Sequence, residues 1–320
     1  MKLKLAVLLG GCCIAAFAQA QNPFVDRSDT GETIRVLPTP ASIHSPVDTQ
    51  PTNAPPHQGT AVYAASYGSG NLIDHGGLEI PNASFQPIYY NGTVANSAGT
   101  QGQSSLQSQI ATFVSDFSST TNYSVSVSDD YTIVQQYSSH ATIASTISVL
   151  PDLVDSKSAA SKYSDSQIRS YLTSLFQAGK LAPNSSTLYG IYFPDGMKIC
   201  LQGGCSCTSF CGYHSAYTYG STQIKYAVFP YPGCTGCSLS GKGPADMLTI
   251  VSSHEIREAV TDPGDFGKNA WYDAAGYEAD DKCAWHNLYQ MTKGGFWVQP
   301  EYSNGNSGNY PGPGCVVPNR

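Results

Sequence analysis

One short segment of the sequence carries the side chains that metal-dependent hydrolysis requires. His254, Glu255 and Glu258 lie in the string Ser252-Ser-His-Glu-Ile-Arg-Glu-Ala-Val-Thr-Asp-Pro263. Residues four apart on a helix stand one above the other, so His254 and Glu258 would share a face. This spacing is that of the zincin helix His-Glu-x-x-His, with Glu258 in place of the second histidine. The segment predicts metal ligands at His254 and Glu258, with Glu255 as a general base that deprotonates a metal-bound water.

The residues around this string predict a helix that turns its polar groups inward. Pro244 suits a first helical turn, and Pro263 helps to end the helix. One stripe carries, at spacings of four, three, four and four, Met247, Val251, His254, Glu258 and Asp262. The apolar half of that stripe should face the core, so the polar half should face inward too. An imidazole and carboxylates buried without partners are unfavourable, and a bound cation would remove that penalty.

A zinc site in a hydrolase also needs a third protein ligand and an open position for water. The acidic candidates are Asp262 and the cluster Glu278, Asp280 and Asp281, and the weaker ones are His214 and His286. Zinc is the expected cofactor. Calcium is the alternative, because an oxygen-rich ligand set suits a hard cation, although a histidine does not. Without a metal, His254 and Glu258 would form one exposed pair worth roughly a few tenths of a kcal/mol.

The elements that must position this helix include both strands and helices. The sequence predicts strands over residues 85–90, 188–193, 197–201 and 225–229, with 197–201 returning beside 188–193 after the Asp195-Gly196 turn. Apolar spacing predicts helices over 106–117 and 165–178, and Ser164 caps the second. We expect a single α+β domain over residues 83–320, zincin-like in its motif helix.

The start of the chain predicts export. Lys2 and Lys4 precede an apolar stretch and the small-x-small sequence Ala18-Gln19-Ala20, so residues 1–20 are typical of a secretory signal peptide. Lipoprotein processing at Cys12 is the alternative. Residues 21–82 contain many prolines and no sustained apolar period, so we expect a flexible, disordered leader or linker. No later segment is apolar enough to serve as a membrane anchor.

Eight cysteines follow the predicted signal peptide, and an even number in an exported protein favours a disulfide framework. They are Cys200, Cys205, Cys207, Cys211, Cys234, Cys237, Cys283 and Cys315. The sequence does not assign their pairing. The alternative is a zinc site built from the cysteines between 205 and 237, which an oxidising compartment disfavours.

The charge balance excludes some partners. The chain of 320 residues has 16 Lys and Arg against 23 Asp and Glu, a formal net charge of −7. No clustered basic face is present, which argues against nucleic acid and against electrostatic docking on an anionic membrane. The 41% hydrophobic fraction suffices for a sizeable core. The oligomeric state stays open.

Several further segments are informative in their order along the chain. They are Phe85-Gln-Pro-Ile-Tyr89, Phe210-Cys-Gly-Tyr-His214, Cys234-Thr-Gly-Cys237, the string 253–263 followed by Trp271-Tyr-Asp273, Glu278-Ala-Asp-Asp-Lys-Cys283, and Trp297-Val-Gln-Pro-Glu-Tyr-Ser-Asn304. With these segments, residues 83–320 resemble the bacterial branch of the phosphate-induced protein 1 family, also called EXORDIUM-like. The resemblance implies an exported protein that acts in or near a cell wall.

The resemblance also bears on individual residues. Plant members lack the His-Glu-x-x-Glu string but keep a Cys-Gly-aromatic-His segment. This implies that the fold does not require the metal site, and it favours a structural role for His214. Bacterial relatives commonly carry His-Glu-Leu-Ala-Glu, whereas this chain has Arg257 where a small residue is usual. On a helix, Arg257 can point away from the face that carries His254 and Glu258.

Two functions are consistent with these features. The first is a secreted metal-dependent hydrolase, peptidase-like, that acts on a peptide or cell-wall polymer. The second is a non-enzymatic extracellular protein that binds polysaccharide, with the many tyrosines and Trp271, Trp285 and Trp297 as stacking surfaces. A tightly bound stoichiometric metal would support the first function and its absence the second.

Overall fold

The protein is described by a computed structural model that covers residues 22–43, 60–118, 130–305 and 310–318. Its centre is a mixed sheet in the order β1-β2-β11-β12-β9-β5-β6, with β7 also paired to β5. The strands are β1 (Val25–Arg27), β2 (Thr33–Pro38), β5 (Ser84–Tyr89), β6 (Ser148–Val149), β7 (Leu153–Val154), β9 (Thr187–Tyr192), β11 (Phe210–Tyr219) and β12 (Thr222–Phe229). Pairing is antiparallel from β1 to β12 and parallel from β12 to β6.

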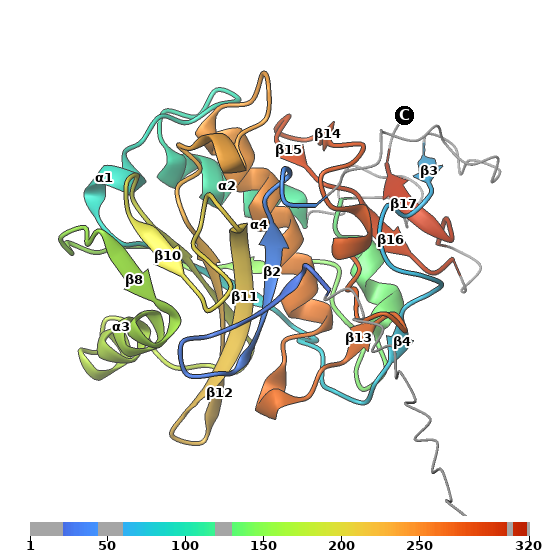
Figure 1. The fold of residues 1–320 in the computed structure, drawn as a ribbon, viewed down its shortest axis with the longest axis horizontal. Helices are drawn as coiled ribbons and strands as arrows, with labels where there is room; N and C mark the ends of the chain where they lie inside the picture. The colour runs from blue at the N-terminus through green and yellow to red at the C-terminus, as the bar shows by residue number, and fades with distance from the viewer. Residues whose placement is uncertain (1–21, 44–59, 119–129, 306–309, 319–320) are drawn as a thin grey trace, which may run out of the picture.

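Helices cover both faces of this sheet (Figure 1). One face packs against α4 (Pro244–Thr261) and α2 (Leu106–Phe117), in a core that also takes Phe229 from the sheet. The other face packs against α3 (Asp165–Gln177), in a core that takes Val228. Successive strand residues point to opposite faces, which is why neighbours such as Val228 and Phe229 lie in different cores.

Smaller sheets and short helices complete the α+β fold. The sheets pair β10 (Lys198–Cys200) with β8 (Lys162–Ser164), β13 (Trp271–Tyr272) with β4 (Ile73–Asp74), β14 (Tyr289–Gln290) with β15 (Trp297–Val298), and β16 (Glu301–Ser303) with β17 (Gly314–Val317), which also pairs with β3 (Ala61–Tyr63). The short helices are α1 (Gly92–Ala95), η2 (Thr132–Tyr137), η3 (Thr235–Cys237), η4 (Asp265–Gly267) and η5 (Asp281–Cys283).

The three long helices and most predicted strands are confirmed within a residue or two. Ser164 and Gln167 form the capping box that begins α3. The predicted hairpin of residues 188–193 with 197–201 is wrong, because β10 pairs in parallel with β8 instead. Strand β9 has no free edge for β10, since β12 and β5 occupy both of its sides.

The prediction of a flexible leader over residues 21–82 is wrong where this region forms strands. Strand β2 lies inside the main sheet, between β1 and β11, and β3 pairs with β17. Ile34 and Val36 are buried in the α3-side core and Leu37 in the α4-side core, so the strand is bound on both faces. The ordered domain therefore begins well before residue 83, while residues 44–59 of the predicted leader lie outside the described residues.

The eight cysteines form four disulfides: Cys200–Cys205, Cys207–Cys234, Cys211–Cys237 and Cys283–Cys315. Because all eight cysteines are bridged, those between residues 205 and 237 do not form the alternative zinc site. The bridges suggest an oxidising, extracellular-type environment. Among the described residues, no helix combines the length and apolar character that crossing a membrane requires. The predicted signal peptide and Cys12 lie outside the described residues.

Candidate metal centre

The candidate site lies between α4 and the sheet, under strand β2. Every residue of α4 from Ala245 to Thr261 is buried, including His254, Glu255 and Glu258. The helix lies close to β11 because Gly212 has no side chain. A Cβ atom there would lie 2.4 Å from Val251 Cγ1 and 3.0 Å from Glu255 Oε1.

His254 and Glu258 approach each other as their spacing on the helix predicts. His254 Nε2 lies 2.9 Å from Glu258 Oε2 and 3.8 Å from Asp281 Oδ1. The backbone N–H of Asp281 donates to Glu258 Oε1 at 2.9 Å. The geometry between His254 Nε2 and its neighbours is not that of a hydrogen bond, and this nitrogen has no hydrogen-bond partner among the described residues. Ligands of one ion approach each other in this way without bonding.

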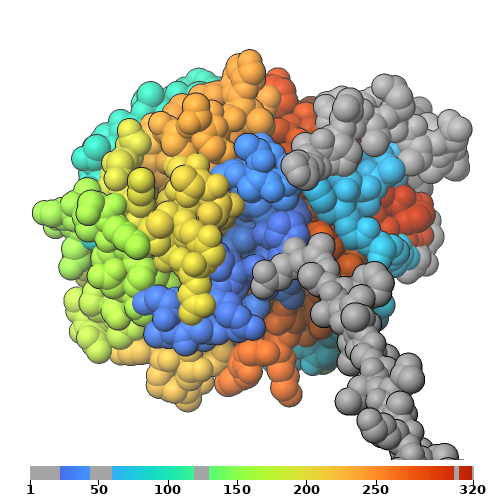
Figure 2. Space-filling model, viewed as in Figure 1, coloured from blue at the N-terminus to red at the C-terminus, as the bar shows by residue number. Residues whose placement is uncertain are grey.

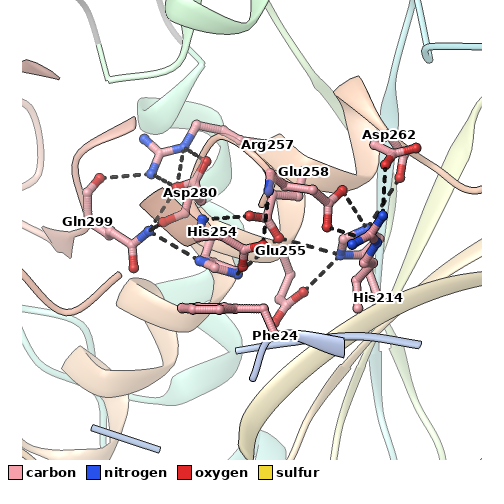
Figure 3. A network of polar contacts seen from close by, with 12 residues as sticks. Phe24, His214, His254, Glu255, Arg257, Glu258, Asp262, Asp280 and Gln299 are labelled. Carbon is pink, nitrogen blue, oxygen red and sulfur yellow. Dashed lines mark hydrogen bonds and ion pairs between the residues drawn. The ribbon is translucent and has the colours of Figure 1, made fainter. Parts of the chain in front are cut away.

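His214 of β11 lies at the centre of the cluster, although the sequence ranks it only as a weaker ligand candidate. Its Nδ1 is 3.0 Å from Glu255 Oε2 and 3.8 Å from Glu258 Oε2 (Figure 3). Its Nε2 is 3.3 Å from the Asp262 carbonyl oxygen and 3.7 Å from Glu278 Oε1. The other weaker candidate, His286, lies beside the Tyr67 hydroxyl at 3.4 Å instead.

Asp262 and Glu278 bring two more carboxylates, and Arg35 of β2 brings a guanidinium. Arg35 Nε is 3.5 Å from Glu278 Oε2, and its Nη2 is 3.9 Å from Asp262 Oδ2. Arg35 donates its hydrogen bond to the Gly276 carbonyl at 2.9 Å. Both Glu278 oxygens and Asp262 Oδ2 are buried without a hydrogen-bond partner among the described residues. Arg35 is therefore near these carboxylates but does not satisfy them.

Arg257 forms a separate, closed group at the edge of the cluster. Its Nε donates to both oxygens of Asp280 at 3.0 and 3.1 Å, and the other two guanidinium nitrogens donate to the Asp130 and Gln299 carbonyls. Arg257 thus points away from Glu258, as the sequence allows, but into the protein rather than into solvent. Because Asp280 is paired with Arg257, we do not count it among the carboxylates available to bind a cation.

Burial dominates the electrostatics of the site. All eight acidic and histidine residues of the cluster are at most 1% exposed: His214, His254, Glu255, Glu258, Asp262, Glu278, Asp280 and Asp281. Burial raises the pKa of Glu258 to about 8, of Asp280 to about 7 and of Asp262 to about 6. It raises the pKa values of Glu255, Glu278 and Asp281 well above their ordinary range. Burial also lowers the pKa of His214 to about 3, so this ring is neutral.

Gln299 determines which nitrogen of His254 carries the proton. Its Nε2 donates to the Asp280 carbonyl at 2.7 Å and lies 3.1 Å from His254 Nδ1. With a donor facing Nδ1, the proton of the neutral ring is on Nε2. A cation on Nε2 would need that proton on Nδ1 and an acceptor opposite it. Turning the Gln299 amide over would present Oε1 as that acceptor, at the expense of the hydrogen bond from Nε2 to the Asp280 carbonyl.

Solvent reaches the cluster at one side. A cavity of about 280 Å³ is lined in part by Arg35, His214 and Asp262. Strand β2 crosses in front of α4 in Figure 1, and Figure 2 shows residues 22–43 in blue on the surface above it. Arg35, His214 and Asp262 therefore belong both to the lining of the cavity and to the cluster.

The tryptophans are engaged in the structure rather than free on its surface. Trp285 Nε1 donates to the Pro38 carbonyl at 2.8 Å, and Trp271 Nε1 donates to Glu79 at 2.9 Å. The Trp297 ring lies under Lys242, whose Nζ is 3.8 Å from the ring centroid. These contacts do not form the shared stacking surface that the polysaccharide-binding alternative would use.

The structure thus brings all six predicted site residues into one cluster: His254, Glu255, Glu258, Asp262, Glu278 and Asp281. It adds three residues that the sequence did not single out as central. His214 comes from β11, Arg35 from the predicted leader, and Gln299 from the segment after β15. His214 is the last residue of the segment Phe210-Cys-Gly-Tyr-His214, and Gln299 lies within the segment 297–304, but neither segment indicated the role of the residue.

Comparisons with known proteins give no relative from which to transfer an identity. No family model matches the chain, no curated protein matches it, and no solved structure matches it.

Proposed function

We propose that the chain is an exported metal-dependent hydrolase, peptidase-like in its chemistry. Its cation would be held by His254 and Glu258, with Asp281 as third ligand and with Asp262 and Glu278 beside them. One observation carries this proposal. His254 Nε2 and oxygens of Glu255, Asp262 and Glu278 are buried close together, and none of these atoms has a hydrogen-bond partner among the described residues.

Glu255 is the proposed general base. It is on the same helix as the ligands, one residue after His254, and its Oε2 lies 3.0 Å from His214 Nδ1. A divalent cation supplies Lewis acidity, which lowers the pKa of water and polarises a carbonyl. Glu255 would take a proton from the attacking water and pass it to the leaving nitrogen. The water oxygen thereby forms a bond to the carbonyl carbon, and the carbon–nitrogen bond breaks.

The finer assignments belong to the same proposal. Zinc fits the histidine and the three-ligand pattern, and calcium is the alternative for a set so rich in oxygen. The zincin-like description rests on a buried His-Glu-x-x-Glu helix packed against a mixed sheet. Membership of the phosphate-induced protein 1 family rests on the ordered motifs of residues 83–320, and secretion rests on the N-terminal sequence and the four bridges.

Metal analysis of the secreted protein tests this function. The full chain, exported to a periplasm and purified without chelator, should contain zinc by mass spectrometry. His254→Ala and Glu258→Ala should lower the metal content, whereas Glu255→Gln should keep the metal and lose peptide hydrolysis. His75→Ala is the control, because His75 is an exposed histidine, stacked on Tyr272, that belongs to no group of candidate metal ligands. Full metal content in both ligand variants would refute the ligand assignment.

A further inference from the structure

A second set of metal ligands shares Glu258 with the first. His214, Glu258 and Glu278 each offer one ligand atom, and these atoms lie within 4.8 Å of one another. The same is true of His254, Glu255 and Glu258. All five residues are buried. Glu258 is thus the only member common to the two groups. Its Oε2 lies 2.9 Å from His254 Nε2 and 3.8 Å from His214 Nδ1, while its Oε1 accepts from the Asp281 backbone N–H.

The surroundings of His214 are unusual because both ring nitrogens face acceptors. Nδ1 faces the carboxylates of Glu255 and Glu258, and Nε2 faces the Asp262 carbonyl and Glu278 Oε1. A neutral imidazole has one proton, so it can satisfy only one of these two sides. If Nδ1–H donates to Glu255, the lone pair of Nε2 is directed toward oxygens alone. A cation beside Nε2 resolves that conflict.

The oxygens around Nε2 are the least satisfied of the cluster. Both Glu278 oxygens and Asp262 Oδ2 have no hydrogen-bond partner among the described residues, and neither does Arg35 Nε. The Arg35 guanidinium lies 3.5 Å from Glu278 and 3.9 Å from Asp262, beyond the usual range of a charge-assisted hydrogen bond. These buried carboxylates are therefore within ion-pair distance of Arg35, but no described residue donates a hydrogen bond to these oxygens.

A count of formal charge gives an independent argument. Apart from the closed group around Arg257, five buried carboxyl groups share the cluster with a single guanidinium, that of Arg35: Glu255, Glu258, Asp262, Glu278 and Asp281. Ionised, as ligands of a cation are, they would carry an excess of four negative charges over Arg35. One divalent cation removes half of it, and two divalent cations neutralise it. In a buried site, where unpaired charge is strongly unfavourable, the second cation matters as much as the first.

We propose that the cluster binds two divalent cations bridged by Glu258, the second held by His214 and Glu278 with Asp262 beside them. The first position, with His254, is the one on which the proposed function rests. In hydrolases with two metals, the ions jointly stabilise the attacking and leaving atoms. His214 is then a metal ligand of this chain rather than a structural histidine.

Zinc counting by native mass spectrometry tests the second site. The full-length exported protein is stripped with chelator, dialysed and titrated with Zn²⁺. The wild type and the His75→Ala control should bind two ions per chain. His214→Ala and His254→Ala should each retain one, and Glu258→Ala should weaken both positions by about 100-fold or more.

Each outcome has a definite meaning. One Zn²⁺ in the wild type, retained by His214→Ala and lost by His254→Ala, overturns the second site and leaves the proposed function standing. No Zn²⁺ in any variant overturns both. If His214→Ala fails to fold by circular dichroism, Glu278→Gln removes the opposite ligand and should also retain one ion. With Mn²⁺ in place of Zn²⁺, the wild type should show a spin-coupled pair by electron paramagnetic resonance, and two uncoupled ions would exclude the bridge.

Discussion

On the α3 face of the main sheet, a buried carboxylate is surrounded by donors, whereas on the α4 face several are not. The Tyr213 and Tyr226 hydroxyls donate to Asp165 Oδ1 at 2.9 and 2.7 Å, and Arg169 Nε lies 3.0 Å from Oδ2. On the α4 face, Glu278 has no such partner among the described residues. Asp165 Oδ2 also has no hydrogen-bond partner among the described residues, but it lies at ion-pair distance from Arg169. Asp165 thus has two hydroxyl donors and a close arginine, whereas Glu278 has only Arg35 at 3.5 Å, so the α4 face is the better candidate for a bound cation.

Strand β11 serves both faces through three successive residues. Tyr213 points to the α3 face and reaches Asp165, while Gly212 and His214 point to the α4 face. This alternation follows from the pleat of a strand. One tetrapeptide, Cys211 to His214, thus contributes a disulfide, a close helix contact, a structural donor and a candidate ligand.

The largest expected difference in the free energy of unfolding is between loss of a buried ion pair on the α4 face and loss of an exposed one near α3. Arg257→Met removes the partner of Asp280 and should lower the free energy of unfolding by about 3–5 kcal/mol, because a carboxylate is left buried and uncompensated. Lys180→Met removes an ion pair whose lysine is 45% exposed, and it should cost about 0–1 kcal/mol. Urea unfolding measures both. Equal losses would show that the two faces do not differ in this respect.

The second comparison replaces one carboxyl group on each face of the sheet by the corresponding amide, in metal-free protein. Asp165→Asn weakens charge-assisted hydrogen bonds and should destabilise the protein by about 1.5–3 kcal/mol. Glu278→Gln removes one excess charge and should instead stabilise it at pH 8, by about 1 kcal/mol. Thermal unfolding in the presence of chelator shows whether each variant is less or more stable than the wild type. A loss of stability in both variants would mean that Glu278 is satisfied in the metal-free protein.

The third test uses pH. In chelator, the raised pKa values of Asp262 (about 6), Asp280 (about 7) and Glu258 (about 8) mean that the folded state holds protons that the unfolded state has released. That contribution to stability is complete below about pH 4, the ordinary range of these acids, and is lost as pH rises through the folded values. The unfolding temperature of metal-free protein should therefore fall by several degrees, about 2–4 °C per kcal/mol, between pH 5 and 8.

With saturating Zn²⁺ the slope should reverse over the same interval, because protons compete with the metal for its ligands. Calorimetry of the two forms in matched buffers makes this measurement. Parallel curves with and without metal would show that no cation relieves the cluster.

The smallest effect belongs to the α3 face alone. Ser164→Ala removes the cap that accepts the Gln167 backbone N–H, and it should cost about 1 kcal/mol with or without metal. Its effect should add to that of Glu278→Gln, since the two residues act on opposite faces of the sheet. A strong departure from additivity would mean that the two faces are coupled.

Local signals accounted for the parts of the fold that could be predicted. The capping box at Ser164 and Gln167, and the proline that begins α4, are set by neighbouring residues, so the sequence located both helices. Pairing between distant segments left no such signal. Strand β2 was hidden in a proline-rich region because its partner β11 comes much later in the chain, and β10 was assigned to β9 because the Asp195-Gly196 turn suggested a hairpin.

The same distinction applies to the site. His254, Glu255 and Glu258 could be placed together because helical spacing brings them to one face. Asp262, Glu278 and Asp281 could be named but not ranked, since their separation depends on the loop after α4. Arg35 lay in no motif, and the segment 297–304 gave no role to Gln299, so only the folded chain shows that they contact the carboxylates or His254.

The pairing of β2 with β11 also sets an order of events in biosynthesis. A nascent chain is made from its N-terminus, so residues 33–38 exist long before the strand that they pair with. When they dock, Arg35 closes over the carboxylates. A cation captured during folding would be enclosed at that moment, and later exchange would require the edge of the sheet to open. The metal found in the protein would then record the supply in the compartment where the chain folded, rather than the intrinsic ranking of metal affinities.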